Sequence, residues 1–146
     1  MQDLPHRYSV ASLAKPEGEV TLQSARLPAL ASAPPAEFGG PGDRWSPETL
    51  LVAAVADCFI LSFRAVARAA KLPWLSLRCE ADGTLDRVER VTQFTAFRVS
   101  ATLRVPPGTD EAQARKSLER AEQICLITNS LKAASQLETV IEIAPA

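Results

Sequence analysis

The sequence predicts an α+β fold, and three observations indicate it. Almost every face is apolar across residues 50–70, which is typical of a buried helix. Two segments of alternating apolar residues, 75–88 and 93–105, follow and indicate strands. A second helical pattern and a last strand at 138–143 complete the order of strands, helix, two strands, helix and strand. With 146 residues, of which 47% are hydrophobic, we expect a single domain, residues 1–146.

The first part of the sequence favours a hairpin followed by a long loop. Residues 7–14 and 19–25 alternate loosely on either side of the turn sequence KPEG, so we expect them to pair. Residues 27–45 are rich in Pro, Ala and Gly, and loops of this length in compact domains are more often functional than idle. A short strand at 27–31 is an alternative that the sequence leaves open.

Clear start and stop residues bound the long apolar helix. Ser46 is a suitable N-cap, Pro47 suits the first helical position, and Glu48 complements the positive end of the helix dipole. Pro73 ends the pattern. Three charged residues interrupt the apolar run, so we expect a core helix, buried on most sides, rather than a membrane span. These residues are Asp57, Arg64 and Arg68.

The second helix is expected after the turn sequence PPG at 106–108. Either Thr109 or Asp110 can cap its start. An apolar stripe at helical spacing then predicts an amphipathic helix that packs one face on the core. The stripe comprises Ala114, Leu118, Ala121 and either Ile124 or Cys125.

Composition and charge narrow the classes of function. The net charge of −1 and a pI near 5.9 give no electrostatic reason to expect binding to nucleic acid or to an anionic membrane. The N-terminus lacks a basic region followed by an apolar run, so we expect a soluble, cytoplasmic protein. A lone histidine, His6, and scattered carboxylates provide no ligand set, and we therefore expect no bound metal.

Two cysteines that lie 67 positions apart (125 − 58) are the candidate functional residues. Cys58 lies near the middle of the long apolar helix, and Cys125 lies at the end of the second helical pattern. Disulfides in the cytosol are usually transient, catalytic or redox-sensing, so a remote pair favours thiol redox chemistry. The alternative is that both thiols are small buried hydrophobic groups, as free cysteines often are. Cys79, in a predicted strand, is expected to be passive.

Several segments together resemble the OsmC/Ohr family of thiol-dependent hydroperoxide reductases. The resemblance covers about residues 35 to 143, and it depends on the two cysteine contexts, their separation and the order of elements rather than on any single motif. The segments are FGG at 38–40, SPETLLVAAVADCF at 46–59, CEADGTLDR at 79–87 and ICLITNSL at 124–131.

The resemblance implies an intertwined homodimer in which an antiparallel sheet wraps around central helices. It implies that Cys58 attacks the terminal oxygen of an organic hydroperoxide and that Cys125 resolves the sulfenic acid as an intramolecular disulfide. A dithiol, such as protein-bound lipoamide, then reduces the disulfide. This chemistry needs no metal, flavin or haem, because sulfenic acid formation is the first, reversible step of thiol oxidation.

In the family, an Arg held by a Glu stabilises the reactive thiolate, because burial on an apolar helix otherwise makes a thiol inert. Glu48 matches that Glu, but the family's Arg lies in the early hairpin, where this chain has Lys15 and Pro16. Arg44 is the substitute candidate, and Arg26, Arg7 and Lys15 are alternatives. If no residue takes the place of the family's Arg, the chain is expected instead to be a non-catalytic OsmC-like protein that binds a ligand or senses redox state.

Helix geometry predicts a site built by two chains. Glu48 and Cys58 are ten residues apart, which corresponds to about 15 Å along a helix. They also point roughly 80° apart, so one straight helix cannot join them, and a second copy is expected to supply the carboxylate. Four aromatic side chains are expected either to line an apolar substrate pocket or to belong to the core. They are Phe38, Trp45, Phe59 and Phe63.

Overall fold

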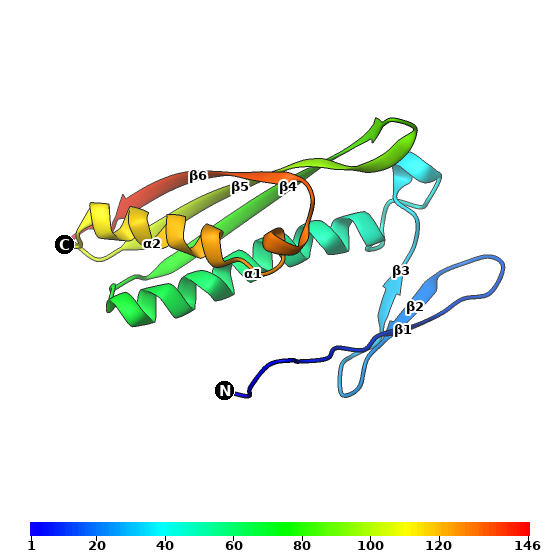
Figure 1. Ribbon diagram of the computed structural model, residues 1–146, viewed down its shortest axis with the longest axis horizontal. Coiled ribbons are helices and arrows are strands. Elements are labelled where there is room, and N and C mark those ends of the chain that lie inside the picture. Colours follow the sequence, from blue (N-terminus) through cyan, green and yellow to red (C-terminus); the bar gives the residue numbers. More distant parts are fainter. The chain divides into compact units, whose positions relative to one another are not determined.

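The computed structural model describes residues 1–146, and they form two compact units (Figure 1). The first unit comprises Met1–Leu51 and the second Val52–Ala146. The boundary falls within the long helix α1 (Pro47–Ala70), whose first five residues belong to the first unit. The α+β class predicted from the sequence is confirmed, since each unit contains a sheet and the second adds two long helices.

The first unit contains a three-stranded antiparallel sheet in the order β1-β2-β3. β1 (Ala11–Leu13) and β2 (Val20–Gln23) form the predicted hairpin, which is shorter than the sequence pattern suggests. The short strand of the proline-rich stretch exists as β3 (Leu30–Ser32), slightly later than expected, and a 3₁₀ turn, η1 (Ala36–Phe38), follows it. The stretch that was expected to be a long loop therefore contains two short regular elements.

A reciprocal capping arrangement starts α1. The backbone N–H of Thr49 donates to Oγ of Ser46 at 3.1 Å, and the N–H of Ser46 donates to Oγ1 of Thr49 at 2.9 Å. Ser46 is 1% exposed, so these bonds satisfy groups that water does not reach. The predicted start is confirmed, and the helix ends at Ala70, ahead of Pro73.

The sheet of the second unit has the order β4-β5-β6. β4 (Ser76–Val88) and β5 (Val91–Val105) form a long antiparallel hairpin, as their patterns predict. β6 (Ala134–Ile143) pairs in parallel with β5, so the sheet is mixed rather than wholly antiparallel. The reason is that α2 (Glu111–Ile124) carries the chain back along the sheet, and such a crossover makes the next strand run in the same direction.

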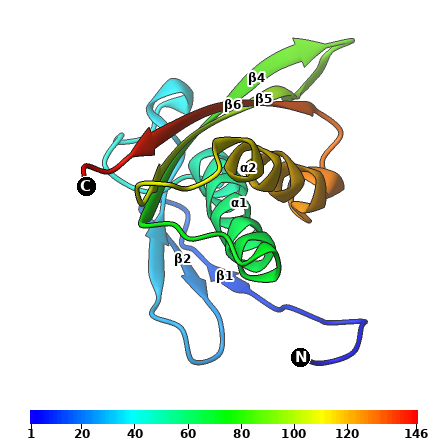
Figure 2. The ribbon, with the colours of Figure 1, turned by 90° about the vertical axis from the view of Figure 1, so that its left-hand side faces the viewer.

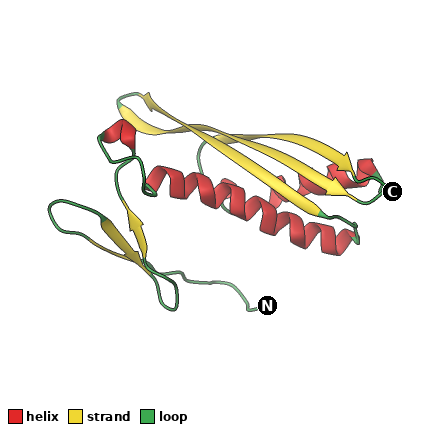
Figure 3. Cartoon of the chain, turned by 180° about the vertical axis from the view of Figure 1, so that it is seen from behind, coloured by secondary structure: helices red, strands yellow, loops and turns green.

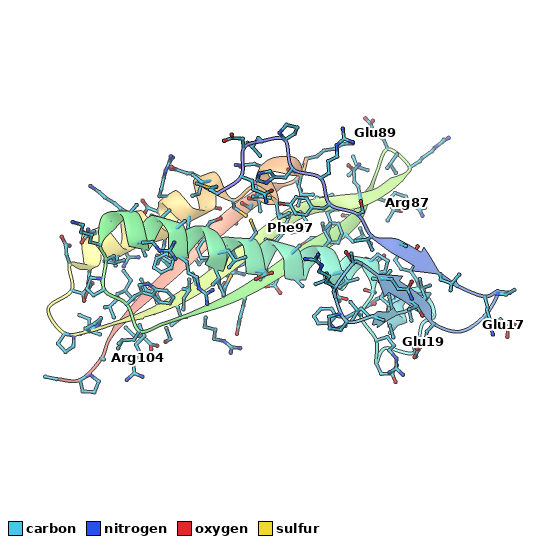
Figure 4. The ribbon with its side chains drawn as sticks, turned by 90° about the horizontal axis from the view of Figure 1, so that it is seen from below. Glu17, Glu19, Arg87, Glu89, Phe97 and Arg104 are labelled. Carbon is cyan, nitrogen blue, oxygen red and sulfur yellow. The ribbon has the colours of Figure 1, made fainter.

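Both helices lie on one face of this sheet, as two views agree (Figures 2 and 3). Asp110, rather than Thr109, is the N-cap of α2, because its side chain accepts from the N–H groups of Ala112 and Gln113. Alternate residues of β5 form the centre of the core, among them Phe97, which is labelled in Figure 4. The buried residues of β5 are Phe97, Val99, Ala101, Leu103 and Val105.

Within one chain, α1 is buried on one side only, whereas the sequence predicts a helix that is buried on most sides. Its buried residues form a single stripe at every fourth position: Val55, Phe59, Phe63 and Ala67. The physical reason is that the sheet and α2 of the second unit cover one side of the helix only. By length and composition alone, α1 would be able to cross a membrane, since one 18-residue window has a mean hydropathy of 2.0. Of that window, 22% is buried. Leu61, on the uncovered side, is 52% exposed.

Candidate functional site

The fold of the second unit brings together the two cysteines that the sequence separates by 67 positions (125 − 58). Cys58 lies half-buried on α1, and Cys125 is the residue that follows α2 and is 1% exposed. Both are free thiols, and they lie close enough for each to affect the pKa of the other. Adjacent thiols of this kind can form a reversible disulfide without a large rearrangement.

Neutral donors surround the thiol pair. Oγ of Ser62, one helical turn after Cys58, lies 3.9 Å from the Cys58 sulfur. On the other side, the turn after α2 contributes the backbone N–H groups of Ile127 and Thr128 and the Thr128 hydroxyl. The site residues predicted from the sequence did not include Ser62, Ile127 or Thr128. The only sequence indication is that hydroxyl residues lie close to each cysteine.

The surroundings shift the pKa values of the two thiols in opposite directions. Burial raises the pKa of Cys58, and hydrogen bonds from Ile127 and Ser62 oppose this only in part. Burial also acts to raise the pKa of Cys125, but donation from Thr128, Cys58 and Ile127 outweighs it and leaves that pKa below its ordinary value.

The third cysteine has a different environment. Cys79 lies on β4 opposite Ala101 of β5, and it is half-buried. Burial, with smaller contributions from Cys125 and Glu80, raises the pKa of Cys79 to about 11. A thiol with this pKa is protonated near neutral pH, which agrees with the passive role expected from the sequence.

Glu48 lies in the first unit, on the wall of a hollow of about 460 Å³. One of its carboxylate oxygens, Oε2, is buried and has no hydrogen-bond partner. The hollow is lined mainly by apolar residues, including Leu22, Pro35 and Phe38. A buried carboxylate oxygen without a donor is costly, so this position is suited to a cationic or hydrogen-donating group that one chain does not provide.

Arg44 does not provide that group. Its Nε donates to Oε1 of Glu19, which is labelled in Figure 4, at 2.6 Å, and its Nη1 lies 3.3 Å from Oδ2 of Asp43. Arg44 and Trp45 line a different hollow from the one that contains Glu48. The expected pairing of Arg44 with Glu48 is therefore absent within one chain, because two nearer carboxylates hold the guanidinium.

The four aromatic candidates divide between surface and core. Phe38 is 58% exposed and Trp45 47% exposed, so both are open to contact. Phe59 and Phe63 are 1% and 0% exposed, so they do not line an open pocket within one chain. The stripe of α1 that carries both residues faces the sheet, so within one chain they belong to the core, which is one of the two alternatives expected from the sequence.

Comparison with known proteins extends these observations. Residues 40–140 match the family model described as OsmC-like protein. The chain is 30% identical over 118 residues to a protein named organic hydroperoxide resistance protein from Xanthomonas axonopodis pv. citri, covering 80% of each chain. It is 27% identical over 121 residues to YmaD, an uncharacterized protein of Bacillus subtilis, covering 81% of this chain and 80% of that one. A solved structure of an OsmC-like protein of unknown function from Vibrio cholerae has the same fold, with a TM-score of 0.84 at 18% identity over 93% of this chain and 100% of that one.

Proposed function

Because this chain belongs to the OsmC-like protein family, we propose that it is a thiol-dependent peroxidase that reduces organic hydroperoxides to alcohols. The observation that carries the proposal is the adjacency of two free thiols, Cys58 and Cys125, with hydrogen-bond donors around them. A relative named for resistance to organic hydroperoxides supports the substrate class.

The proposed reaction has two chemical steps. The sulfur of Cys58 attacks the terminal oxygen of the hydroperoxide, the O–O bond breaks, and the alcohol leaves with a proton while Cys58 becomes a sulfenic acid. Cys125 then attacks the sulfenic sulfur, which forms the disulfide and releases the second oxygen as water or hydroxide. The two thiols supply both electrons, and an external dithiol, of which a lipoyl group is one example, restores them by exchange.

We further propose that the active form is a homodimer. The uncovered apolar side of α1, with Leu61 at 52% exposure, favours a second copy as its cover. The unpartnered Glu48 oxygen supports a site that is incomplete in one chain. In a two-fold arrangement of the central helices, Glu48 of one copy would lie near Cys58 of the other. A reducing cytoplasm, where thiols remain reduced, is the proposed location.

One observation favours a second function class, a non-catalytic ligand binder or redox sensor with the same fold. Arg44 is held by Glu19 and Asp43, and the groups that shift the pKa of Cys58 include no cation. A thiol without a cationic partner reacts more slowly with peroxide. Turnover distinguishes the classes, since a sensor reacts once, whereas an enzyme consumes hydroperoxide repeatedly.

The test is hydroperoxide consumption with excess dihydrolipoamide, compared with other thiol reductants and with hydrogen peroxide as substrate. We expect many turnovers on cumene hydroperoxide, slower reaction with hydrogen peroxide, and no activity in Cys58→Ser. Cys79→Ser is the matched control and should retain activity. Wild type that stops after a single equivalent with every dithiol would refute the enzyme and leave the sensor.

A further inference from the structure

A hollow of about 590 Å³ lies where α1 ends and the chain turns toward β4. Two of its lining residues, Ala67 and Leu72, are apolar and only 1% and 5% exposed. Three others are exposed cations, and no acidic residue lines the hollow. The cations are Arg64, Arg68 and Lys71, and the ion pairs of the structure include none of them. We call this region the basic hollow.

The spacing of the three cations makes them repel one another. Arg64 and Arg68 are four residues apart, and Arg68 and Lys71 are three apart, so each pair is adjacent on the helix surface. Like charges at these spacings destabilise a helix. The preceding residues at the same spacings are uncharged and cannot offset the repulsion, whereas an anion bound among the cations would remove it. These preceding residues are Ile60, Leu61 and Ala65.

The end of α1 does not need this cluster as a cap. Cations near a helix C-terminus are favourable because the last carbonyls lack partners within the helix. Here the N–H of Leu72 donates to the carbonyl of Ala67 at 2.9 Å, and Nε2 of Gln113 donates to the carbonyl of Ala70 at 3.1 Å. The carbonyl of Arg68 also accepts from a backbone N–H. Three of the last four carbonyls of α1 therefore have neutral partners.

Lys71 occupies a position that usually belongs to glycine. It follows the last residue of α1 and has a φ of 53°, in the left-handed region. Glycine is favoured at this position because a side chain is strained there. A lysine at this point therefore costs stability, and it adds a third cation to the basic hollow.

Trp74 adds an aromatic ring to the same hollow. Its ring meets that of Phe63 edge to face, with centroids 5.3 Å apart and an angle of 80° between the planes. Because Phe63 is fully buried, this contact anchors Trp74 to the core. Trp74 itself is half-buried, so part of its ring remains accessible. A ligand bound by the cations can therefore also make an apolar contact.

We propose that the basic hollow binds a phosphate monoester, with the three cations on the phosphate group and Trp74 against the organic part. A monoester carries a charge of roughly −1.5 to −2 near pH 7 and three acceptor oxygens, which suit three cationic donors. The guanidinium groups of Arg64 and Arg68 present paired N–H donors that match phosphate oxygens.

The proposed site goes beyond the thiol chemistry and does not depend on it. It also lies outside the contact proposed between two copies. That contact brings Glu48 near Cys58 and is therefore centred on Ala53, midway between them in the sequence. Arg64 lies about 16 Å farther along the helix axis, and Arg68 and Lys71 lie farther still.

The test is an NMR titration of the reduced, full-length protein at constant ionic strength, with the indole N–H signal of Trp74 as reporter. The probes are phenyl phosphate, inorganic phosphate and benzoate. We expect saturable binding that is tightest for phenyl phosphate. Benzoate, which has one charge and two acceptor oxygens, should bind about tenfold more weakly than phenyl phosphate. Arg68→Gln should weaken the binding of phenyl phosphate by about tenfold.

Arg120→Gln is the matched control, because it removes the same charge from an exposed arginine of a helix. Arg120 lies on α2, outside the basic hollow, and donates to Oε1 of Gln123 at 3.3 Å. This variant should bind phenyl phosphate like wild type. Lys71→Gly should weaken binding and, without ligand, raise the urea midpoint by roughly 0.5 M, because glycine relieves the strain.

Four results would overturn the proposal. The first is a signal of Trp74 that does not saturate with phenyl phosphate. The second is inorganic phosphate that binds as tightly as phenyl phosphate, which would mean that the organic part makes no contact. The third is an equal loss of affinity in Arg68→Gln and Arg120→Gln, which would indicate attraction by net charge alone. The fourth is wild-type affinity in Lys71→Gly.

Discussion

Oxidation by one equivalent of organic hydroperoxide is expected to stabilise the fold against unfolding. The Cys58–Cys125 disulfide would close a loop of 67 residues (125 − 58) that includes β4, β5 and α2. In the chain-entropy model, a loop of this length removes enough freedom from the unfolded state to stabilise the folded state by about 4 kcal/mol. Because the two thiols already lie close together in the reduced protein, little of this is expected to be lost to strain.

The assay is urea unfolding of reduced and peroxide-treated protein, followed by circular dichroism. With a slope of roughly 2 kcal/mol per molar urea, the midpoint of the oxidised protein should rise by roughly 2 M. Cys125→Ser, treated in the same way, should show no rise, and mass spectrometry should find the 58–125 link within one chain. Equal midpoints for reduced and fully disulfide-linked wild type would refute the reasoning, as would a link through Cys79.

Three further predictions follow from individual residues. Cys125→Ser should perform one turnover with hydroperoxide and then over-oxidise at Cys58 to sulfinic acid, which intact-mass measurement detects, whereas recovery of activity with a dithiol would contradict the resolving role. Gly83→Ala should destabilise the second unit by about 1–3 kcal/mol, seen as a lower urea midpoint, because its Cβ would come within 2.8 Å of Phe94 Cε1 and 2.9 Å of Val52 Cγ2. The folded-state pKa of Cys79 is raised from 9.0 to about 11, so its contribution to stability is complete below pH 9 and is lost as the pH rises toward 11. Cys79→Ala should reduce the loss of stability between pH 9 and pH 11. An unchanged slope in the variant would mean that other groups cause this loss.

Local patterns were sufficient for most of the fold. The start of α1 was predicted correctly because a capping hydroxyl, a proline and a carboxylate in consecutive positions act through backbone groups within one turn. The parallel direction of β6 was not predictable from its alternation, since a period of two is the same in parallel and antiparallel strands. The exposure of one side of α1 was also not predicted. Apolar residues on every face of a helix do not indicate which of them a single chain buries.

The sequence by itself determined the α+β class and the element order, and it made Cys58 and Cys125 the candidate site residues, because these depend on residue type and short-range spacing. Only the tertiary structure decided which groups meet. It placed the two thiols against each other and against the turn at Ile127 and Thr128, and it left Glu48 without a partner while Arg44 was held by other carboxylates. Contacts across 25 or 67 positions depend on how the chain returns in three dimensions, and no local pattern records that path.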